Sequence, residues 1–142
     1  MKLHVVGYDT APESLVNASE LRDCPWAEKG CFKQQYKWDT DDARGILTVR
    51  FTCKRLIDRT LSGKELVVVK QHEQQHFDDF KAIVMKLKQS IQTSINTEKP
   101  LDMDNRMEWF DWDVNEASNQ FHRRVSMMPN VMIPPMNPRP NP

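Results

Sequence analysis

Two histidines with a glutamate between them are the residues of this chain best suited to chemistry, in the run His72-Glu73-Gln74-Gln75-His76. Residues four apart on an α-helix project from one face, so both imidazoles can reach one ion. Zinc accepts imidazole nitrogen in tetrahedral geometry, and catalytic zinc sites add a third protein ligand and a water. Glu73 would lie beside that water and take its proton. The H-E-x-x-H spacing is therefore typical of a zinc-dependent hydrolase.

The apolar residues around the motif predict the helix that carries it. They follow the three-and-four spacing of an amphipathic helix at Val69, Phe80, Ile83, Val84, Leu87 and Ile91. We expect His72 and His76 to lie on this stripe and to face inward. Burying both beside a carboxylate is costly unless a cation is shared between them. The alternative is a pair of ordinary core or surface histidines, in which case the protein would bind no metal.

The N-terminal half predicts a small sheet. Residues 2–8 favour a strand, and residues 12–22 have an apolar spacing that predicts a helix. Strands are predicted over residues 31–38 and 45–55, with an acidic turn between them, and these two should pair antiparallel.

Two long helices are predicted after the sheet. Ser62 as N-cap and Glu65 in a capping box start the first, which runs from about residue 64 to about residue 93. Pro100 and the polar residues before it end this helix, and a second helix covers about residues 101–124. The short connection predicts antiparallel packing. The expected fold is thus α+β and zincin-like, with a small N-terminal antiparallel sheet packed on two long antiparallel helices.

Length and charge limit the possible classes of protein. A chain of 142 residues with 39% hydrophobic content has the size of one domain. We assign this domain to residues 1–126. The 20 basic residues balance the 20 acidic ones without a long basic run, so nucleic acid is a poor candidate partner. A membrane span is not expected, because no stretch approaches the roughly 18 apolar residues that one needs.

Residues 127–142 form a proline-rich segment, in which six residues are proline. This composition predicts an extended tail without regular structure. The tail could dock on the domain or on a protein partner, and the alternative is an end of the chain with no role.

The cysteines and the first residues bear on the compartment. Cys24 and Cys31 bracket a turn-rich segment and could form one small loop, while Cys53 is left over. Residues 1–9 lack the pattern of a secretory leader, so the chain as written is expected in the cytoplasm. Free thiols are therefore the favoured state of Cys24 and Cys31.

A third zinc ligand has to come from outside the motif. The acidic and aromatic segment of the second helix offers four carboxylates, those of Glu108, Asp111, Asp113 and Glu116. Asp79 lies on the motif face but is expected to orient His76 rather than bind the ion.

The aromatic and basic residues of the second helix are not expected to bind the metal. Trp109, Phe110 and Trp112 are expected to pack between helices. His122 is predicted to be an exposed histidine, although it or Arg123 could stabilise an oxyanion.

The run His72 to Asp78 resembles the signature of a bacterial family of predicted secreted zinc proteases, catalogued as domain of unknown function nine-hundred-and-twenty-two. The likeness spans most of the chain and includes a tryptophan-bearing strand similar to residues 36–38. A Tyr-Asp segment of that family, which supplies an aspartate ligand, resembles Trp112-Asp113. The resemblance thus implies Asp113 as the third ligand. Tryptophan here stands for the family's tyrosine, and the family's possible oxyanion donor has no counterpart.

A rival assignment of the third ligand is also open. Asn115-Glu116-Ala117-Ser118 resembles the ligand helix of thermolysin-like zincins and would make Glu116 the ligand.

The motif and the resemblance predict a zinc metallopeptidase acting on a protein or peptide substrate. His72, His76 and Asp113 would hold Zn²⁺, and Glu73 would activate the zinc-bound water to attack the peptide bond. The resembling family is predicted to be secreted or periplasmic. The alternative function is a degenerate zincin that acts as a non-catalytic protein-interaction module.

Overall fold

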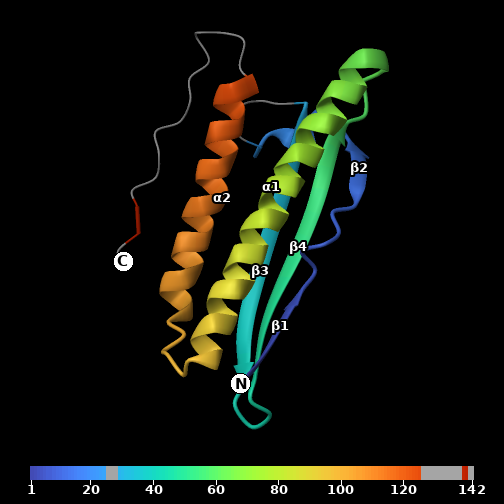
Figure 1. Cartoon of the computed structure of the whole chain (residues 1–142). Helices are drawn as coiled ribbons and strands as arrows, with labels where there is room; N and C mark the ends of the chain where they lie inside the picture. Colours follow the sequence, from blue (N-terminus) through green and yellow to red (C-terminus); the bar gives the residue numbers. More distant parts are fainter. Residues whose placement is uncertain (25–28, 126–138, 141–142) are drawn as a thin grey trace. The chain divides into compact units, whose positions relative to one another are not determined.

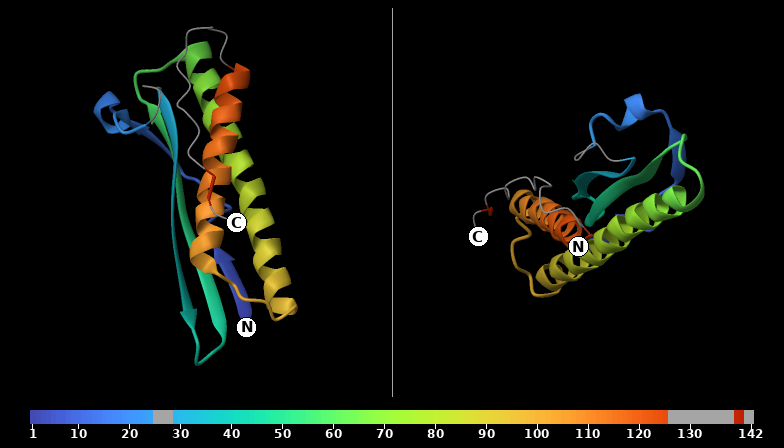
Figure 2. Two further views of the ribbon diagram at one scale, coloured as in Figure 1. Left: turned by 90° about the vertical axis from the view of Figure 1, so that its left-hand side faces the viewer. Right: turned by 90° about the horizontal axis from the view of Figure 1, so that it is seen from above.

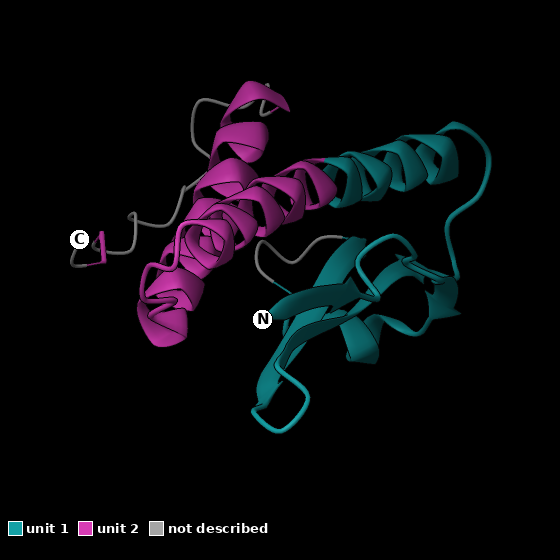
Figure 3. Cartoon of the chain, turned by 60° about the horizontal axis from the view of Figure 1, so that its bottom comes forward, with its two compact units in different colours: residues 1–78 teal, residues 79–142 magenta. Residues whose placement is uncertain are grey.

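The computed structural model describes residues 1–24, 29–125 and 139–140, and the predicted α+β class is confirmed (Figure 1). The chain divides into two compact units, residues 1–78 and residues 79–142 (Figure 3). The elements in order are β1 (Lys2–Val6), β2 (Glu13–Val16), the short 3-10 helix η1 (Ala18–Leu21), β3 (Gly30–Asp41), β4 (Ile46–Asp58), α1 (Gly63–Asn96) and α2 (Met103–Val125). The boundary between the units falls inside α1, which is one continuous helix.

β4 is the central strand of the first unit. β3 pairs with it antiparallel along most of its length, and the two long strands run side by side (Figure 2). β1 pairs in parallel with the first residues of β4, and β2 pairs in parallel with its last residues. The predicted antiparallel pair is therefore present as β3 and β4. The expectation of an antiparallel sheet is wrong for the other two pairings, because β1 and β2 join the edge of β4 in the parallel direction.

The helix predicted over residues 12–22 is wrong. Residues 13–16 form β2, and only the short η1 follows. Three apolar residues in this segment carry a weak helical signal, and pairing with β4 outweighs it. Val16 and Leu21 still reach a common buried cluster with Cys24, Cys31 and Leu56.

Every second side chain along much of β4 is buried, and these side chains form part of the core of the first unit. Leu47, Val49, Phe51 and Cys53 are buried, while the residues between them point to the other face or to solvent. β1 is followed by Gly7, whose φ is +82° and where a Cβ atom would lie 2.0 Å from the carbonyl oxygen of Phe51. Only glycine combines that backbone conformation with so close an approach.

Both predicted long helices are confirmed, and their ends lie one to three residues from the predicted ones. In the second unit, Phe80 of α1 contacts Phe110 of α2 with ring centroids 5.9 Å apart. Farther along α1, Ser90 and Ser94 accept hydrogen bonds from Arg106, nearer the start of α2. The later part of α1 and α2 therefore run antiparallel. None of the helices in the described part of the chain is long and apolar enough to cross a membrane.

The prediction of free thiols at Cys24 and Cys31 is wrong. The two residues form a disulfide with Cα atoms 5.9 Å apart, and both are buried. Cys53 is a free cysteine, 5% exposed on β4, and burial raises the pKa of its thiol to about 11.

Thiol counting tests this assignment. In denaturant without reductant we expect one reactive thiol per chain, because only Cys53 is unpaired. After reduction we expect three. In native buffer Cys53 should react slowly, since the thiolate is the reactive form and its raised pKa leaves little thiolate near neutral pH. Three thiols in denaturant alone would show that the disulfide does not form.

Candidate metal centre

A polar network and an aromatic contact help to hold the motif helix on the sheet of the first unit. Arg55 of β4 donates a hydrogen bond to Gln74 (2.7 Å), whose amide donates to Asp78 (2.9 Å). On β3, the ring of Phe32 stacks on Phe77 with centroids 5.8 Å apart. These contacts hold the turns of α1 that carry the motif.

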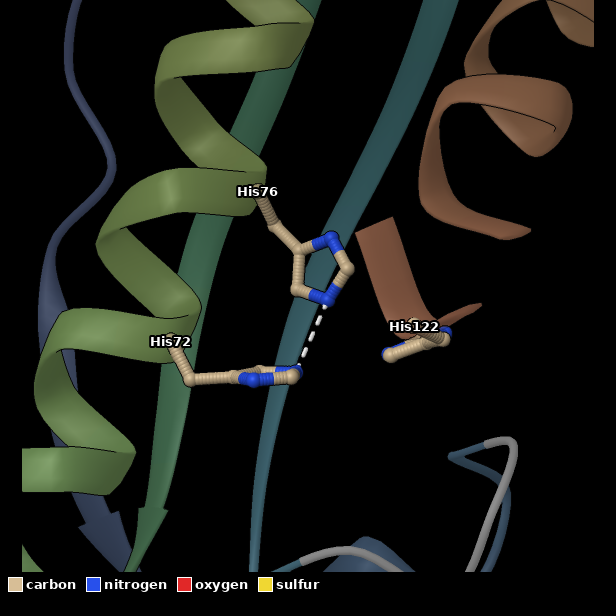
Figure 4. A group of neighbouring side chains, drawn as sticks. All are labelled: His72, His76 and His122. Carbon is tan, nitrogen blue, oxygen red and sulfur yellow. Dashed lines mark hydrogen bonds between the residues drawn. The ribbon is translucent and has the colours of Figure 1, made fainter. Parts of the chain in front are cut away.

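His72 and His76 project from consecutive turns of α1 and bring their ring nitrogens together (Figure 4). Their Nε2 atoms are 3.1 Å apart, and both side chains are half-buried. Two nitrogens bound to one zinc at 2.0–2.1 Å in tetrahedral geometry are separated by about 3.3 Å. The two rings share a hydrogen bond at this distance, and the separation is also close to what a shared ion requires.

A third histidine, His122 of α2, joins this group. Each of the three residues offers a ring nitrogen, and these nitrogens all lie within 4.8 Å of one another (Figure 4). The three histidines can thus bind a metal ion. Three imidazole ligands would leave a fourth tetrahedral position for water or substrate, as in catalytic zinc sites.

Glu73 lies on the buried stripe of α1, whereas the two half-buried histidines lie toward one edge of it. The buried positions of this stripe are Glu73, Phe77, Phe80, Val84, Leu87, Ile91 and Ser94. The sequence predicted that the histidines lie on this stripe and face inward, but the glutamate is the residue that is only 1% exposed. Helix geometry turns Glu73 about 100° from His72 and about 60° from His76. Its carboxylate therefore projects beside the histidine pair from within the core.

Gly30 at the start of β3 makes room for Glu73. A Cβ atom at Gly30 would lie 2.7 Å from Cγ1 of Val69, 3.0 Å from Cγ of Glu73 and 3.1 Å from its Oε1. The absence of a side chain lets the strand backbone pack directly against the motif helix. Gly30 thereby helps to fix the position of the Glu73 side chain.

Replacing Gly30 with alanine is expected to lower the free energy of unfolding by about 1–3 kcal/mol, the usual cost of overpacking a core. Denaturant unfolding would measure it. Because Val69 is the nearest obstacle, the same substitution in a Val69→Ala background should cost at least about 0.5 kcal/mol less. Equal costs in the two backgrounds would contradict the packing explanation.

Asp113, the predicted third ligand, lies at a different place in the second unit. It lines a pocket of about 440 Å³ together with Ile83, Lys86, Leu87, Ser90, Pro100, Leu101, Asp102, Asn105, Arg106, Trp109 and Phe110. Loss of water around its carboxylate raises the pKa of Asp113, an effect that the Lys86 ammonium opposes. Lys86 follows His76 by ten residues on α1, about 15 Å along the helix axis.

Helix geometry also separates Asp113 from His122. Nine residues on α2 correspond to about 13.5 Å along the axis and to opposite faces of the helix. The structure does not bring Asp113 into the histidine group, nor the alternatives Glu108, Asp111 and Glu116. Ligation by Asp113 stays a prediction that this placement does not support, and the orienting role of Asp79 likewise stays a prediction.

Sequence reasoning treated His122 as an exposed or oxyanion-stabilising residue and so missed its place beside the motif histidines. One signal could have found it. If two helices joined by a short connection run antiparallel, the end of the second returns to the level of the start of the first. His122, near the end of α2, is therefore the residue to pair with a motif in the first half of α1.

Comparison with known proteins adds no relative: no protein-family model, no curated protein and no solved structure matches this chain. The resemblance to the zinc protease family stays a prediction from the motif.

Proposed function

We propose that this protein is a zinc-dependent peptidase in which His72, His76 and His122 hold Zn²⁺ and Glu73 is the general base. The observation that carries the proposal is the gathering of the three imidazoles, whose ring nitrogens lie within 4.8 Å of one another. Neutral imidazole nitrogen is a preferred zinc ligand, and three such ligands with an open fourth position are the donor set of a catalytic zinc site.

The register of the two helices supports His122 as the third ligand in place of Asp113. Ser94 and Ser90 contact Arg106, whereas Phe80, nearer the start of α1, contacts the later residue Phe110. The last turns of α2 lie beyond the contact of Phe110 with Phe80. His122 belongs to those turns, whereas Asp113 belongs to the level of Lys86.

The chemistry divides between the ion and the chain. When bound, zinc lowers the pKa of a coordinated water to about 7 and polarises the substrate carbonyl. Glu73 accepts the proton of the attacking water and returns it to the leaving amine. Packing against Gly30 restricts the Glu73 side chain, so its carboxylate is held in position before substrate binds.

One observation favours the alternative, a metal-binding module without catalysis. Glu73 is 1% exposed, and a general base has to reach the water that attacks the substrate. A carboxylate so completely buried also suits a structural role beside the metal. The two functions differ in one respect that can be measured, because only the peptidase cleaves a peptide while it holds zinc.

A digestion experiment tests the proposed function. The purified chain, loaded with one equivalent of zinc, is incubated with a peptide library whose products are identified by mass spectrometry. We expect cleavage that a chelator stops and that added zinc restores. One bound zinc per chain with no cleavage of any peptide would favour the non-catalytic module instead.

A further inference from the structure

Arg139 is held by two tryptophan rings in the second unit. Its guanidinium carbon lies 5.4 Å from the ring centroid of Trp109 and 5.4 Å from that of Trp112. The two indoles are themselves 5.8 Å apart and inclined at 69°, so they present two faces to one cation. A guanidinium within about 6 Å of an indole face is attracted by the ring quadrupole, and a planar guanidinium can also stack on it.

Carboxylates share the helix face that carries the two rings. Trp109, Trp112, Asp113 and Glu116 follow the spacing of one face of α2, three and four residues apart. Negative charge beside the rings favours a cation there. The face therefore combines the two features that recognise arginine, aromatic surface and anionic charge.

The residue that follows Arg139 adds to the recognition. Proline at position 140 disfavours the helical conformation for Arg139 and keeps it extended. An arginine restricted in this way loses less conformational entropy on docking than one in a flexible segment.

We propose that Trp109 and Trp112 form a binding site for an arginine followed by proline, and that Arg139-Pro140 of the same chain is its resident occupant. The rings were predicted to pack between helices, and the tail was predicted to be extended and able to dock on the domain or on a protein partner. The contact of Arg139 with the two rings joins these two features. Trp109 also lines the 440 Å³ pocket of this unit. Arg139 thus contacts α2 beside this pocket, and an Arg-Pro segment added from outside would have to compete with it.

The indole N–H signals of the full-length protein test the contact directly in ¹H–¹⁵N spectra. Arg139→Ala is expected to shift the signals of Trp109 and Trp112 and to leave that of Trp38 in place. Arg123→Ala, at an exposed arginine of α2, is the matched control and should shift neither signal. Unchanged Trp109 and Trp112 signals in Arg139→Ala would overturn the proposal, as would equal shifts in the control.

Competition by a free peptide tests whether the rings are a binding site. The probe is the pentapeptide Asn-Pro-Arg-Pro-Asn, titrated into the full-length wild type and into Arg139→Ala. A tethered occupant acts at a local concentration on the order of millimolar, so wild type should need several-fold more peptide than Arg139→Ala for half-maximal shift of the Trp109 and Trp112 signals. A peptide with lysine for arginine should bind Arg139→Ala more weakly. Equal midpoints for the two proteins, or equal binding of the lysine peptide, would contradict the proposal, and neither readout depends on zinc or peptidase activity.

Discussion

Replacing Glu73 with glutamine should lower peptide turnover by about 10²–10⁴-fold, the usual contribution of a general base, and should leave zinc bound. Glutamine has nearly the same volume as glutamate, so it fits the space beside Gly30 and Val69. Its amide cannot accept the proton of the attacking water. Turnover of the best peptide from the library digest and the zinc content of the purified variant are the two measurements.

The control for this variant is a substitution on the exposed side of the same helix turn. Gln75 is exposed, and Gln75→Glu should retain wild-type turnover and zinc. If Glu73→Gln cleaves at the wild-type rate, Glu73 is not the base and the proposed mechanism is wrong. If it loses zinc together with activity, the carboxylate helps to hold the metal site, and its role is not that of a base alone.

Removing either motif histidine should abolish the stabilisation of the protein by zinc. At a zinc concentration of 100 times the dissociation constant, wild type should gain about 2.7 kcal/mol of stability. For a chain of this size that corresponds to a rise in Tm of roughly 10 °C. His72→Ala and His76→Ala should gain little under the same conditions, because each leaves the ion only two of the three nitrogens in the group.

The chain supplies a matched control for these variants. The sequence has four histidines, and His4 is the one outside the group of three. It lies on β1. His4→Ala should keep the full zinc-dependent rise in Tm. A comparable loss in His4→Ala, or a full rise in His72→Ala, would contradict the assignment of the motif histidines as ligands.

Features encoded locally could be predicted from the sequence. The long periodic pattern around the motif predicts α1, because its buried residues recur every three or four positions along the helix. The antiparallel pair of β3 and β4 follows from two β-favouring runs joined by an acidic turn. The pairing of His72 with His76 follows from helix geometry alone.

Features set by tertiary packing could not be predicted in this way. Which edge of β4 accepts β1 and β2, and in which direction, depends on contacts distant in sequence. The apolar spacing that suggested a helix around Leu15 is too short to compete with strand pairing. The Cys24–Cys31 disulfide depends on backbone approach, whereas the sequence argument inferred the redox compartment from the first residues.

The third ligand shows the same limit most clearly. The family resemblance directs attention to Asp113, whose segment combines a carboxylate with aromatic neighbours. The structure places Asp113 at a pocket beside Lys86, where the aromatic neighbours Trp109 and Trp112 contact Arg139. Composition identifies residues able to bind metal. It does not encode the tertiary contact that brings His122 close to His72 and His76.

The most direct test of the central claim is the zinc affinity of His122→Ala against that of Asp113→Ala, each measured by competition with a chromophoric chelator. The three-histidine site predicts that Asp113→Ala binds one zinc with the affinity of wild type, whereas His122→Ala binds at least about 100-fold more weakly. Wild-type affinity in His122→Ala together with lost affinity in Asp113→Ala would contradict the three-histidine site and return the third ligand to the aspartate.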